Sequence, residues 1–507
     1  MNDAVQWTAW SVFAAIFALV TILGFLSARW KRADLDHLHE WGLAGRRFGT
    51  VILWFLMGGD LYTAYTVIAV PALVYAKGAF GFFAMPYTII AFVIFFVVMP
   101  PLWNVCHKHG YVTISDFVEG RYRSRWLALA IALTGVLATM PYIALQLVGM
   151  QVVFAQMGFG GLHGGAEIAL IVAFLVLALY TYSSGLRAPA MIAFVKDAML
   201  YVFVIAAVVV IPAKLGGYGA IFTAAGKVFA DKPGTGLLLQ PGQYLPFATL
   251  ALGSAGALFL YPHAATGVLA ASGPQAIRRN AMLLPAYSVA LGLIALMGYM
   301  AIAAHVDAKG SAIVPALIAQ SFPEWFAGFC YAAIALGALV PAAIMSIGAA
   351  NLVTRNIWKP LVNRDIDARS EAKIAKITSL LVKFGALLFV VLLSQDLAIN
   401  LQLLGGIWML QAFPAVVFGL VTRWFRAGGL LAGWAAGMAL GTGLSWMQGW
   451  SSGVKTTWMV PGVGVVYLGL LALLANVVVA AIGSGLATVL ARPRAADATS
   501  PSDYMDG

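Results

Sequence analysis

Charged residues and cysteines are both scarce in this sequence, and each scarcity excludes a class of protein. Only 10% of the 507 residues are charged whereas 62% are hydrophobic, so a soluble core could not hide the apolar side chains. The two cysteines, Cys106 and Cys330, fall at the end of one apolar stretch and inside another. No disulfide is therefore expected between them. The histidines are scattered, and His37 with His39 lack the further ligands that a metal site needs.

Strict alternation of apolar and polar residues in units of about ten is also missing, which argues against a membrane β-barrel. Apolar stretches of about 20 residues recur instead, the length with which a helix crosses a bilayer. The sequence therefore predicts an all-α polytopic membrane protein with about 13 transmembrane helices. The predicted spans are residues 7–28, 49–75, 80–105, 126–155, 165–184, 188–213, 246–271, 282–304, 324–354, 375–395, 398–422, 428–447 and 460–488.

The distribution of basic residues predicts the topology. An odd number of spans places the termini on opposite sides of the membrane, and the side with more Lys and Arg is the cytoplasm. The N-terminus is then outside and the C-terminus inside. This choice leaves few basic residues in the outer loops: Lys77, Lys214, Lys227, Lys232, Lys309 and Lys455. The net charge of +11 is thus a topology signal and does not indicate nucleic-acid binding.

The chain is expected to form one transmembrane domain, residues 1–490, followed by a disordered cytoplasmic tail, residues 491–507. The first span has no basic residues before it and ARWKR after it, which is typical of a retained anchor. The tail, ARPRAADATSPSDYMDG, is small, polar and rich in residues that favour disorder. No signalling domain is expected.

Two spans carry helix-breaking residues near their centres, where transporters interrupt helices to expose backbone groups. Span 2 carries Gly58, Gly59 and Asp60, and span 7 carries Gly253, Ser254 and Gly256 followed by Pro262. Because five spans separate the breaks, spans 2–6 (about 49–213) and 7–11 (about 246–422) form a predicted 5+5 inverted repeat. The alternative is that these glycines only allow close helix packing.

Polar residues of four spans lie at similar depth. At 1.5 Å per residue, Asp60, Asp197, Ser346 and Tyr261 each lie about 13 to 18 Å from the cytoplasmic end of their span. All are therefore expected near the middle of a core about 30 Å thick, which predicts a shared site.

Several motifs resemble the sodium/solute symporter family: GYVTISDFVEGRY (110–122), SSGLRAPAMIAFVKD (183–197), Pro262 with His263, and PAAIMSIGAANLVTRNIWK (341–359). More narrowly, GGDLYTAYTVIAVPALVY (58–75) and MPYIALQLVGMQ (140–151) resemble the bacterial monocarboxylate permease branch, whose substrates are small acids such as lactate, pyruvate and acetate. The resemblance implies a LeuT-type fold, with spans 2 and 7 as the broken helices.

The resemblance also implies a sodium site built from carbonyls near Gly58 and Leu61, the Ala343 carbonyl and the Ser346 hydroxyl. Two departures weaken it. The next position after Ser346, usually Ser or Thr in the family, is Ile347, and the family's Thr before Asp197 is Lys196. Our hypothesis is that Lys196 takes or contests the place of the sodium ion and carries a coupled proton.

Two alternatives to this hypothesis are that Lys196 snorkels towards the cytoplasm or forms a structural ion pair, and that sodium is used despite the changes. Asp197 is either a coupling residue or a packing partner. Lys383 is expected to snorkel near the inner face.

A carboxylate at the midplane needs hydrogen-bond donors, which the amides at the break in span 2 could supply. The predicted substrate-binding residues follow from this requirement and from the aromatic gates beside it: Asp60, Leu61, Tyr62, Thr63, Tyr65, Tyr142, Gln146 and Tyr261. Asp60 is expected to cap amides or to bind a cation, because an ionised carboxylate would repel the substrate.

The predicted function is secondary active import of small monocarboxylates across the bacterial inner membrane, with protons favoured over sodium as the driving ion. The expected partners are the monocarboxylate, the coupling cation and the lipid bilayer, with a monomer as the functional unit and no cofactor. Alternatives are sodium-coupled transport of an amino acid, sugar or vitamin, and a sensor that does not transport. A channel is disfavoured because the ends of the spans are apolar, whereas a channel needs a polar stripe through the whole bilayer. An enzyme is disfavoured because no nucleophile and base converge at either face.

Overall fold

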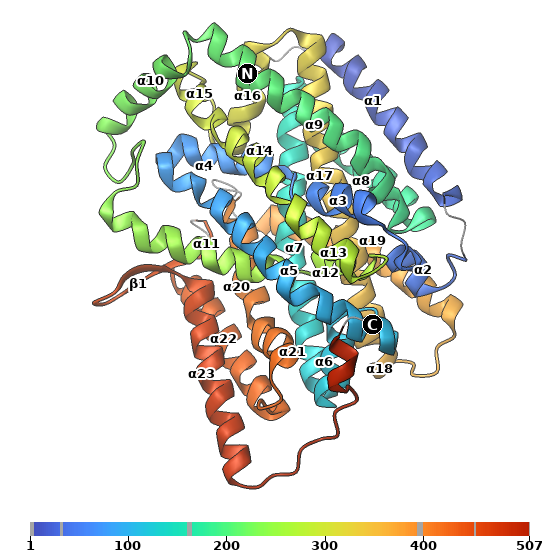
Figure 1. Ribbon diagram of the computed structural model, residues 1–507. Helices are drawn as coiled ribbons and strands as arrows, with labels where there is room; N and C mark the ends of the chain where they lie inside the picture. The colour runs from blue at the N-terminus through green and yellow to red at the C-terminus, as the bar shows by residue number, and fades with distance from the viewer. Residues whose placement is uncertain (1–4, 31–33, 160–164, 393–398, 451–452, 506–507) are drawn as a thin grey trace.

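The computed structural model describes residues 5–30, 34–159, 165–392, 399–450 and 453–505, and most of them are helical (Figure 1). The first half contains α1 (Trp7–Leu26), α2 (Leu38–Leu43), α3 (Thr50–Gly59), α4 (Val70–Lys77), α5 (Ala84–His109), α6 (Ile114–Tyr122), α7 (Arg125–Gln156), α8 (Gly165–Ser184), α9 (Arg187–Lys214) and α10 (Tyr218–Ala230). The second half contains α11 (Tyr244–Leu258), α12 (Pro262–Leu269), α13 (Pro274–Leu283), α14 (Pro285–Ala295), α15 (Met297–Ala303), α16 (Ile313–Ser321), α17 (Glu324–Leu352), α18 (Lys359–Leu361), α19 (Ala368–Leu392), α20 (Ile399–Met409), α21 (Gly419–Val421), α22 (Ala427–Met447), strands β1 (Thr457–Val460) and β2 (Gly464–Tyr467), and α23 (Leu468–Val489).

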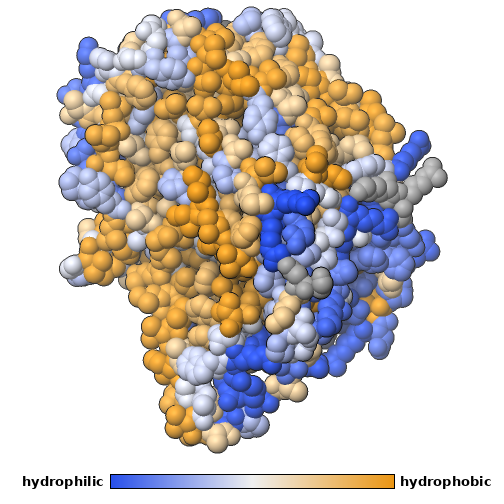
Figure 2. All heavy atoms as spheres, viewed as in Figure 1, coloured by the Kyte–Doolittle hydropathy of each residue, from blue (hydrophilic) through white to orange (hydrophobic). Residues whose placement is uncertain are grey.

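The helices are those of a multi-pass membrane protein. Within the described residues, 9 helices are long and apolar enough to cross a bilayer, or 10 if the bent pair around Pro262 counts as one span. Each of the predicted stretches overlaps a helix or a broken helix, but the number 13 itself stays a prediction. Figure 2 shows hydrophobic residues over much of the visible face, as expected of a lipid-contacting surface, with hydrophilic residues mainly toward the lower right of the view.

The first predicted break is present. Helix α3 ends at Gly59, residues 60–63 are non-helical, and a π-helical turn, Tyr65–Ala69, leads into α4. The two halves of this span are therefore separated by non-helical backbone, whose N–H and C=O groups need hydrogen-bond partners outside a regular helix.

The second break lies at a different place from the glycines that suggested it. Helix α11 runs unbroken through Gly253 and Gly256, and the chain turns at Phe259–Tyr261 before α12, with a bend of 49°. The glycines allow close packing instead, because a Cβ at Gly253 would lie 2.4 Å from the Tyr467 ring. Pro262, which cannot donate a backbone hydrogen bond, begins the new helix.

The inner ends of the two broken spans are joined. Phe48, just before α3, forms a parallel bridge with Ala271, just after α12. Its amide donates to the Ala270 carbonyl at 3.1 Å, and its carbonyl accepts from Ser272 at 2.9 Å. Helix α17 passes through the centre of the molecule, and its most apolar 18-residue window is 100% buried.

Two features of the C-terminal region differ from the sequence prediction. Residues 457–467 form an antiparallel hairpin, so the last span begins at Leu468 and not at residue 460. The tail was predicted to be disordered, but residues 491–505 run from the end of α23 back to α5 and α6 (Figure 1). Asp497 pairs with Arg121 at 2.6 Å, and Asp503 lies 2.6 Å from Lys108 and 2.8 Å from His109.

Candidate functional site

The break in α3 turns two carbonyl groups towards a buried ammonium. Lys196 of α9 donates hydrogen bonds to the Gly59 carbonyl and, at 3.2 Å, to the Tyr62 carbonyl. Its Nζ atom also lies 3.1 Å from Asp197 Oδ1, and both side chains are 0% exposed. The Lys196 side chain therefore ends inside the molecule and does not snorkel to the surface.

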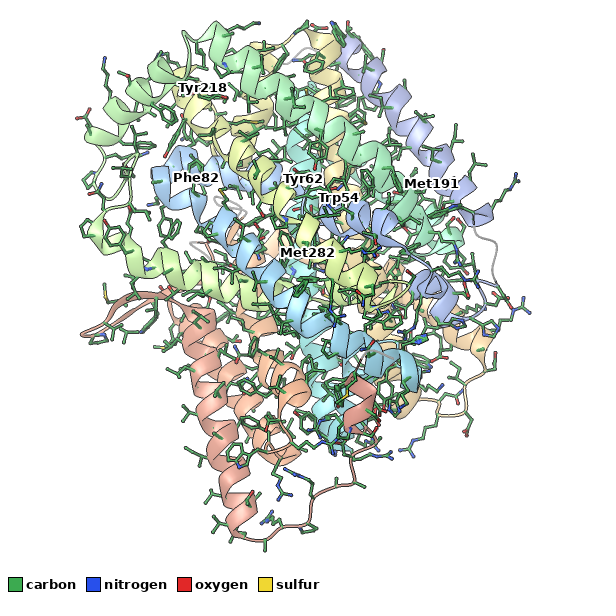
Figure 3. The ribbon with its side chains drawn as sticks, in the orientation of Figure 1. Trp54, Tyr62, Phe82, Met191, Tyr218 and Met282 are labelled. Atoms are coloured by element: carbon green, nitrogen blue, oxygen red, sulfur yellow. The ribbon has the colours of Figure 1, made fainter. Side chains whose placement is uncertain are left out.

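A tyrosine fixes the carboxylate of this pair. Tyr287 of α14 donates its hydroxyl proton to Asp197 Oδ2 at 2.7 Å, and its ring packs against Tyr62 at a centroid distance of 4.7 Å. Figure 3 labels Tyr62 in the middle of the bundle, close to α14. The ammonium–carboxylate pair is thus held by three helical segments, α3, α9 and α14.

A second pair lies on the other side of the break. Asp60 Oδ2 is 3.5 Å from His263 Nε2, which belongs to the first turn of α12. Asp60 is 7% exposed and His263 is 1% exposed. Within the described part of the chain, Asp60 Oδ1 and His263 Nδ1 have no hydrogen-bond partner. Unpaired buried polar atoms are costly, so these two atoms mark a place where a polar ligand would be stabilised.

Two aromatic rings form a wall beside His263. Tyr142 lies at centroid distances of 5.5 Å from Tyr261 and 5.5 Å from His263, and Tyr261 lies 5.2 Å from His263. The Tyr261 hydroxyl donates to the Gln402 carbonyl of α20 at 3.2 Å. Tyr142 of α7 and Tyr261, just before α12, therefore lie against the imidazole, and their role in substrate binding stays a prediction.

The backbone amides at the break are already paired. The Ala64 amide donates to Gln146 Oε1 and the Tyr65 amide to Thr63 Oγ1, each at 3.0 Å. Gln146 and Thr63 therefore cap the outer half of the span, the role that the sequence suggested for Asp60. The amides of residues 61–63 donate to carbonyls of the same turn, so in this conformation none of them is free for a carboxylate.

The carbonyls that hold the cation are displaced by one residue from those predicted. The Gly58 carbonyl accepts from the Leu61 and Tyr62 amides, and the Leu61 carbonyl accepts from the Thr63 amide at 3.0 Å. Gly59 and Tyr62, with the same spacing of three residues, face the ammonium instead.

Ala343 and Ser346 are not brought to this break. The Ser346 hydroxyl donates to the Ala343 carbonyl at 2.8 Å, and it accepts from Ser379 of α19 at 3.1 Å. The part of α17 that faces the break is Gly337, where a Cβ would lie 3.3 Å from the Tyr62 carbonyl oxygen. Nine residues of helix turn the direction by about half a revolution, so Ser346 points away.

Lys383 belongs to the same second cluster. Its Nζ lies 3.3 Å from Ser379 Oγ, and the residue is 3% exposed. Lys383 is therefore buried, in contrast to the predicted snorkelling residue.

A narrow cavity remains between the break that follows α3, helix α5 and helix α14. It measures about 10 Å³ and is lined in part by Leu61, Tyr62, Thr66 and Tyr287. This is room for about one water molecule. Tyr65, buried in the same region, packs against Tyr87 at 6.1 Å. With its polar residues at most 7% exposed, the site is occluded from both sides.

A larger cavity of about 550 Å³ lies near the end of α4. It is lined by the ends of α4, α11 and α20 and by the β1 region, and reaches inward to Phe83 and Leu403. Among its described lining residues, the charged ones are Lys77 and Lys455. The charge that lines this cavity, called the vestibule below, is therefore positive.

Three residues at the centre were not among the predicted site residues. His263 appeared in the sequence only as part of the motif with Pro262, although a histidine in the middle of an apolar span is itself a signal of function. Tyr287 and Gly337 carried no such signal, because a tyrosine or a glycine in a span is common.

The fold and its broken helices define a secondary transporter, and comparison with known proteins agrees. The family model described as "Sodium:solute symporter family" matches residues 41–437. The chain is 56% identical over 500 residues to the "Monocarboxylate transport permease protein" of Rhizobium johnstonii, covering 98% of this chain and 100% of that protein. It is 35% identical over 438 residues to "Uncharacterized symporter YodF" of Bacillus subtilis, covering 84% and 86%.

Among solved structures, a Na⁺-coupled sialic acid symporter in a substrate-bound outward-open state superposes with a TM-score of 0.74. The alignment covers 94% of this chain and 97% of that one at 15% identity. The neighbour has the LeuT fold, so the predicted fold class is confirmed. The chain belongs to the sodium:solute symporter family. A transporter of this family binds a solute and a coupling ion within the membrane.

Proposed function

We propose that this protein imports small monocarboxylates together with protons across the bacterial inner membrane, with its N-terminus in the periplasm and its C-terminus in the cytoplasm. The observation that carries the choice of ion is the Lys196 ammonium on the Gly59 and Tyr62 carbonyls. The name of the Rhizobium relative supports the substrate class.

A sodium ion does not fit beside this ammonium. Sodium needs several oxygen ligands, and here the two carbonyls at the break already accept from Lys196. Two unit charges about 4 Å apart repel by about 4 kcal/mol at an effective dielectric constant of 20. Lys196 therefore supplies, as part of the chain, the positive charge that a bound cation would bring.

The second pair, Asp60 with His263, supplies a place for the transported proton. Lys196 and Asp197 cancel each other's charge, so Asp60, whenever it is ionised, supplies the net charge of the centre. An entering carboxylate would meet this negative charge. One proton shared by Asp60 and His263 removes it and provides an N–H or O–H donor for the substrate. Anion and proton then favour each other's binding.

Coupling follows from this mutual dependence. The anion is stable in the centre only with the proton. By this count the empty centre and the centre that holds both anion and proton carry the same single negative charge, whereas the anion alone doubles that charge and the proton alone removes it. Only the empty and the fully loaded centre would then allow the broken helices to move against their scaffold. Tyr142 and Tyr261 provide the apolar faces for the short carbon chain of a small acid.

The positive vestibule favours anions before they reach the centre. Lys77 and Lys455 line its wall, and a positive cleft raises the local concentration of anionic substrates. Sugars would gain nothing from these charges, which favours an acid over a sugar as the solute.

The test is uptake of radiolabelled lactate, pyruvate and acetate by purified protein in proteoliposomes. The gradients are an inward proton gradient without sodium, and an inward sodium gradient at equal pH. Uptake driven by protons alone supports the proposal. Uptake that requires sodium overturns proton coupling, and uptake of only an amino acid, sugar or vitamin overturns the substrate class. Binding without any uptake would identify a sensor.

A further inference from the structure

We propose that the tail side of the α22–α23 pair holds a binding site for the phosphate headgroup of an anionic phospholipid. The site is a cavity of about 690 Å³ between the start of α22, the end of α23 and the tail. In Figure 1 these two helices stand at the edge of the molecule, and the tail leaves from the lower end of α23.

The lining of this cavity is strongly basic. Five arginines contribute to it, with one carboxylate: Arg121, Arg423, Arg426, Arg492, Arg494 and Asp497. Asp497 is engaged with Arg121 at 2.6 Å and lies 3.7 Å from Arg423. The carboxylate therefore neutralises one side of the cavity, and the positive charge of the other side is left for a ligand.

Arg426 is the residue that most directly indicates an anionic ligand. Its Nε and Nη1 atoms are buried, and none of the described residues accepts a hydrogen bond from either. Its backbone amide donates to Ser484 Oγ at 3.0 Å, which fixes the residue at the start of α22. The 21-residue helix α22 also places the positive end of its dipole here. A phosphate oxygen pair matches the fork geometry of a guanidinium group.

The neighbouring charges confirm an excess of positive potential. Burial lowers the pKa of Arg494 from its ordinary value, and the nearby guanidinium groups of Arg426 and Arg121 lower it further. Arg494 remains charged at any physiological pH. The cluster therefore repels itself until an anion binds.

The apolar half of the cavity favours a lipid over a soluble anion. Phe425, Leu486 and Leu490 line it beside the arginines. Leu486 is 57% exposed and Leu490 is 64% exposed. Ile482, about one helical turn before Leu486, is 58% exposed. An exposed apolar row on a membrane helix is a surface for acyl chains. A headgroup on the arginines would thus leave its chains along α23, as basic pockets between transmembrane helices do for anionic lipids.

The experiment measures thermal stabilisation of the full-length protein in a neutral detergent. The probes are phosphatidylglycerol, phosphatidylcholine, glycerol 3-phosphate and inorganic phosphate. The test variant is Arg492→Gln with Arg494→Gln, two exposed side chains at the start of the tail. The matched control is Arg364→Gln with Lys373→Gln, which removes the same charge from two exposed positions, one in the turn before α19 and one in the first turns of α19.

Phosphatidylglycerol is expected to raise Tm saturably in the wild type and in the control. In the test variant its apparent affinity is expected to fall about 30-fold, since each basic residue near the headgroup contributes about a factor of five. Arg426→Gln, examined separately, is expected to lose the response without any change in the tail. An equal response of test and control variants overturns the proposal. A saturable response to inorganic phosphate or glycerol 3-phosphate, equal to that of the lipid, assigns the site to a soluble anion and overturns the lipid assignment.

Discussion

Lys196 Nζ lies 3.2 Å from the Tyr62 carbonyl oxygen, so a side chain of α9 fills the hydrogen-bonding need created by the break in α3. A backbone break deep in a membrane is stable only if its carbonyls are satisfied. Lys196 therefore both satisfies the backbone carbonyls of the break and supplies a positive charge. Substitutions can separate these two roles.

Lys196→Met keeps the length of the side chain and removes the charge. It leaves Asp197 buried without its cation, a loss of about 3 to 5 kcal/mol for pairs of this kind, and uptake is expected to fall by more than about 100-fold. Lys196→Thr also frees the two carbonyls, and uptake by this variant is expected to be stimulated by sodium.

The matched control for Lys196→Met is Lys383→Met, since Lys383 is a second buried lysine that lies off the site. It is expected to change protein yield more than ion dependence. Proton-driven uptake by Lys196→Met at the wild-type rate would show that Lys196 has no role in coupling.

His263→Asn and Asp60→Asn test the site of the transported proton. Each removes a titratable group from the pair and is expected to abolish accumulation against a gradient. Exchange of labelled for unlabelled substrate is expected to continue at a reduced rate in at least one of them. The measurement is the pH profile of net uptake and of exchange, side by side. Net proton-driven accumulation by both variants would assign the proton to Lys196 and Asp197.

Tyr287→Phe removes the hydroxyl that donates to Asp197 at 2.7 Å and keeps the ring against Tyr62. A buried carboxylate oxygen left without this donor costs about 1 to 3 kcal/mol. We expect a lower kcat, with a smaller effect on KM, because the pair and not the substrate loses its partner. Tyr299→Phe, in the neighbouring α15, is the control and is expected to leave both constants near wild type.

Lys77→Gln combined with Lys455→Gln tests the vestibule. The apparent KM at low ionic strength is expected to rise about threefold, and the difference from wild type is expected to vanish in high salt because the charges are exposed. Lys227→Gln with Lys232→Gln, which changes the same charge outside the vestibule, serves as the control. A rise in KM that is insensitive to salt, or equal in the control, would contradict electrostatic attraction.

The tail is expected to stay bound at neutral and mildly acidic pH. Hydrogen bonds from Lys108, from the Ser500 amide and from His109 hold the pKa of Asp503 well below its usual range. A carboxyl group whose pKa is lower in the bound state stabilises binding above its ordinary pKa of about 3.9, and the stabilisation is lost as the pH falls through the depressed value.

The measurement for the tail is the mobility of a spin label at Ser502→Cys, which is exposed whereas Cys106 and Cys330 are buried. The label is expected to be immobile from pH 8 to about pH 4, and mobile at pH 7 after Asp503→Asn. Asp365→Asn, in another loop, is the control. A label equally mobile in wild type and Asp503→Asn would show that these bonds do not hold the tail.

Periodicity and composition were enough to predict a helical multi-pass membrane protein and the break in span 2, but in span 7 the glycines lie away from the break. They could not give the register of the carbonyls, because Gly58 and Leu61 are satisfied within the turn and this depends on its exact dihedral angles. They also could not predict which face of α17 is turned towards the break in span 2. Only a neighbour such as Gly337 tells which way the helix is rotated.

Two errors had signals that the sequence did contain. Residues 461–462 are Pro-Gly between short β-branched and aromatic runs, which is a hairpin signal inside an otherwise apolar stretch. In span 7, Pro262 alone marked the break, since a proline ends the hydrogen bonding of the preceding turn whereas glycines in a membrane helix are common.

The tethered ammonium also sets the energetics of accumulation. A cation that is part of the chain returns with the empty transporter, so one anion entering with one proton moves no net charge across the membrane. In the proposed mechanism the membrane voltage then does no work on the substrate. Each unit of pH difference supports about a tenfold accumulation of the acid, and an alkaline exterior would drive the same acid out of the cell.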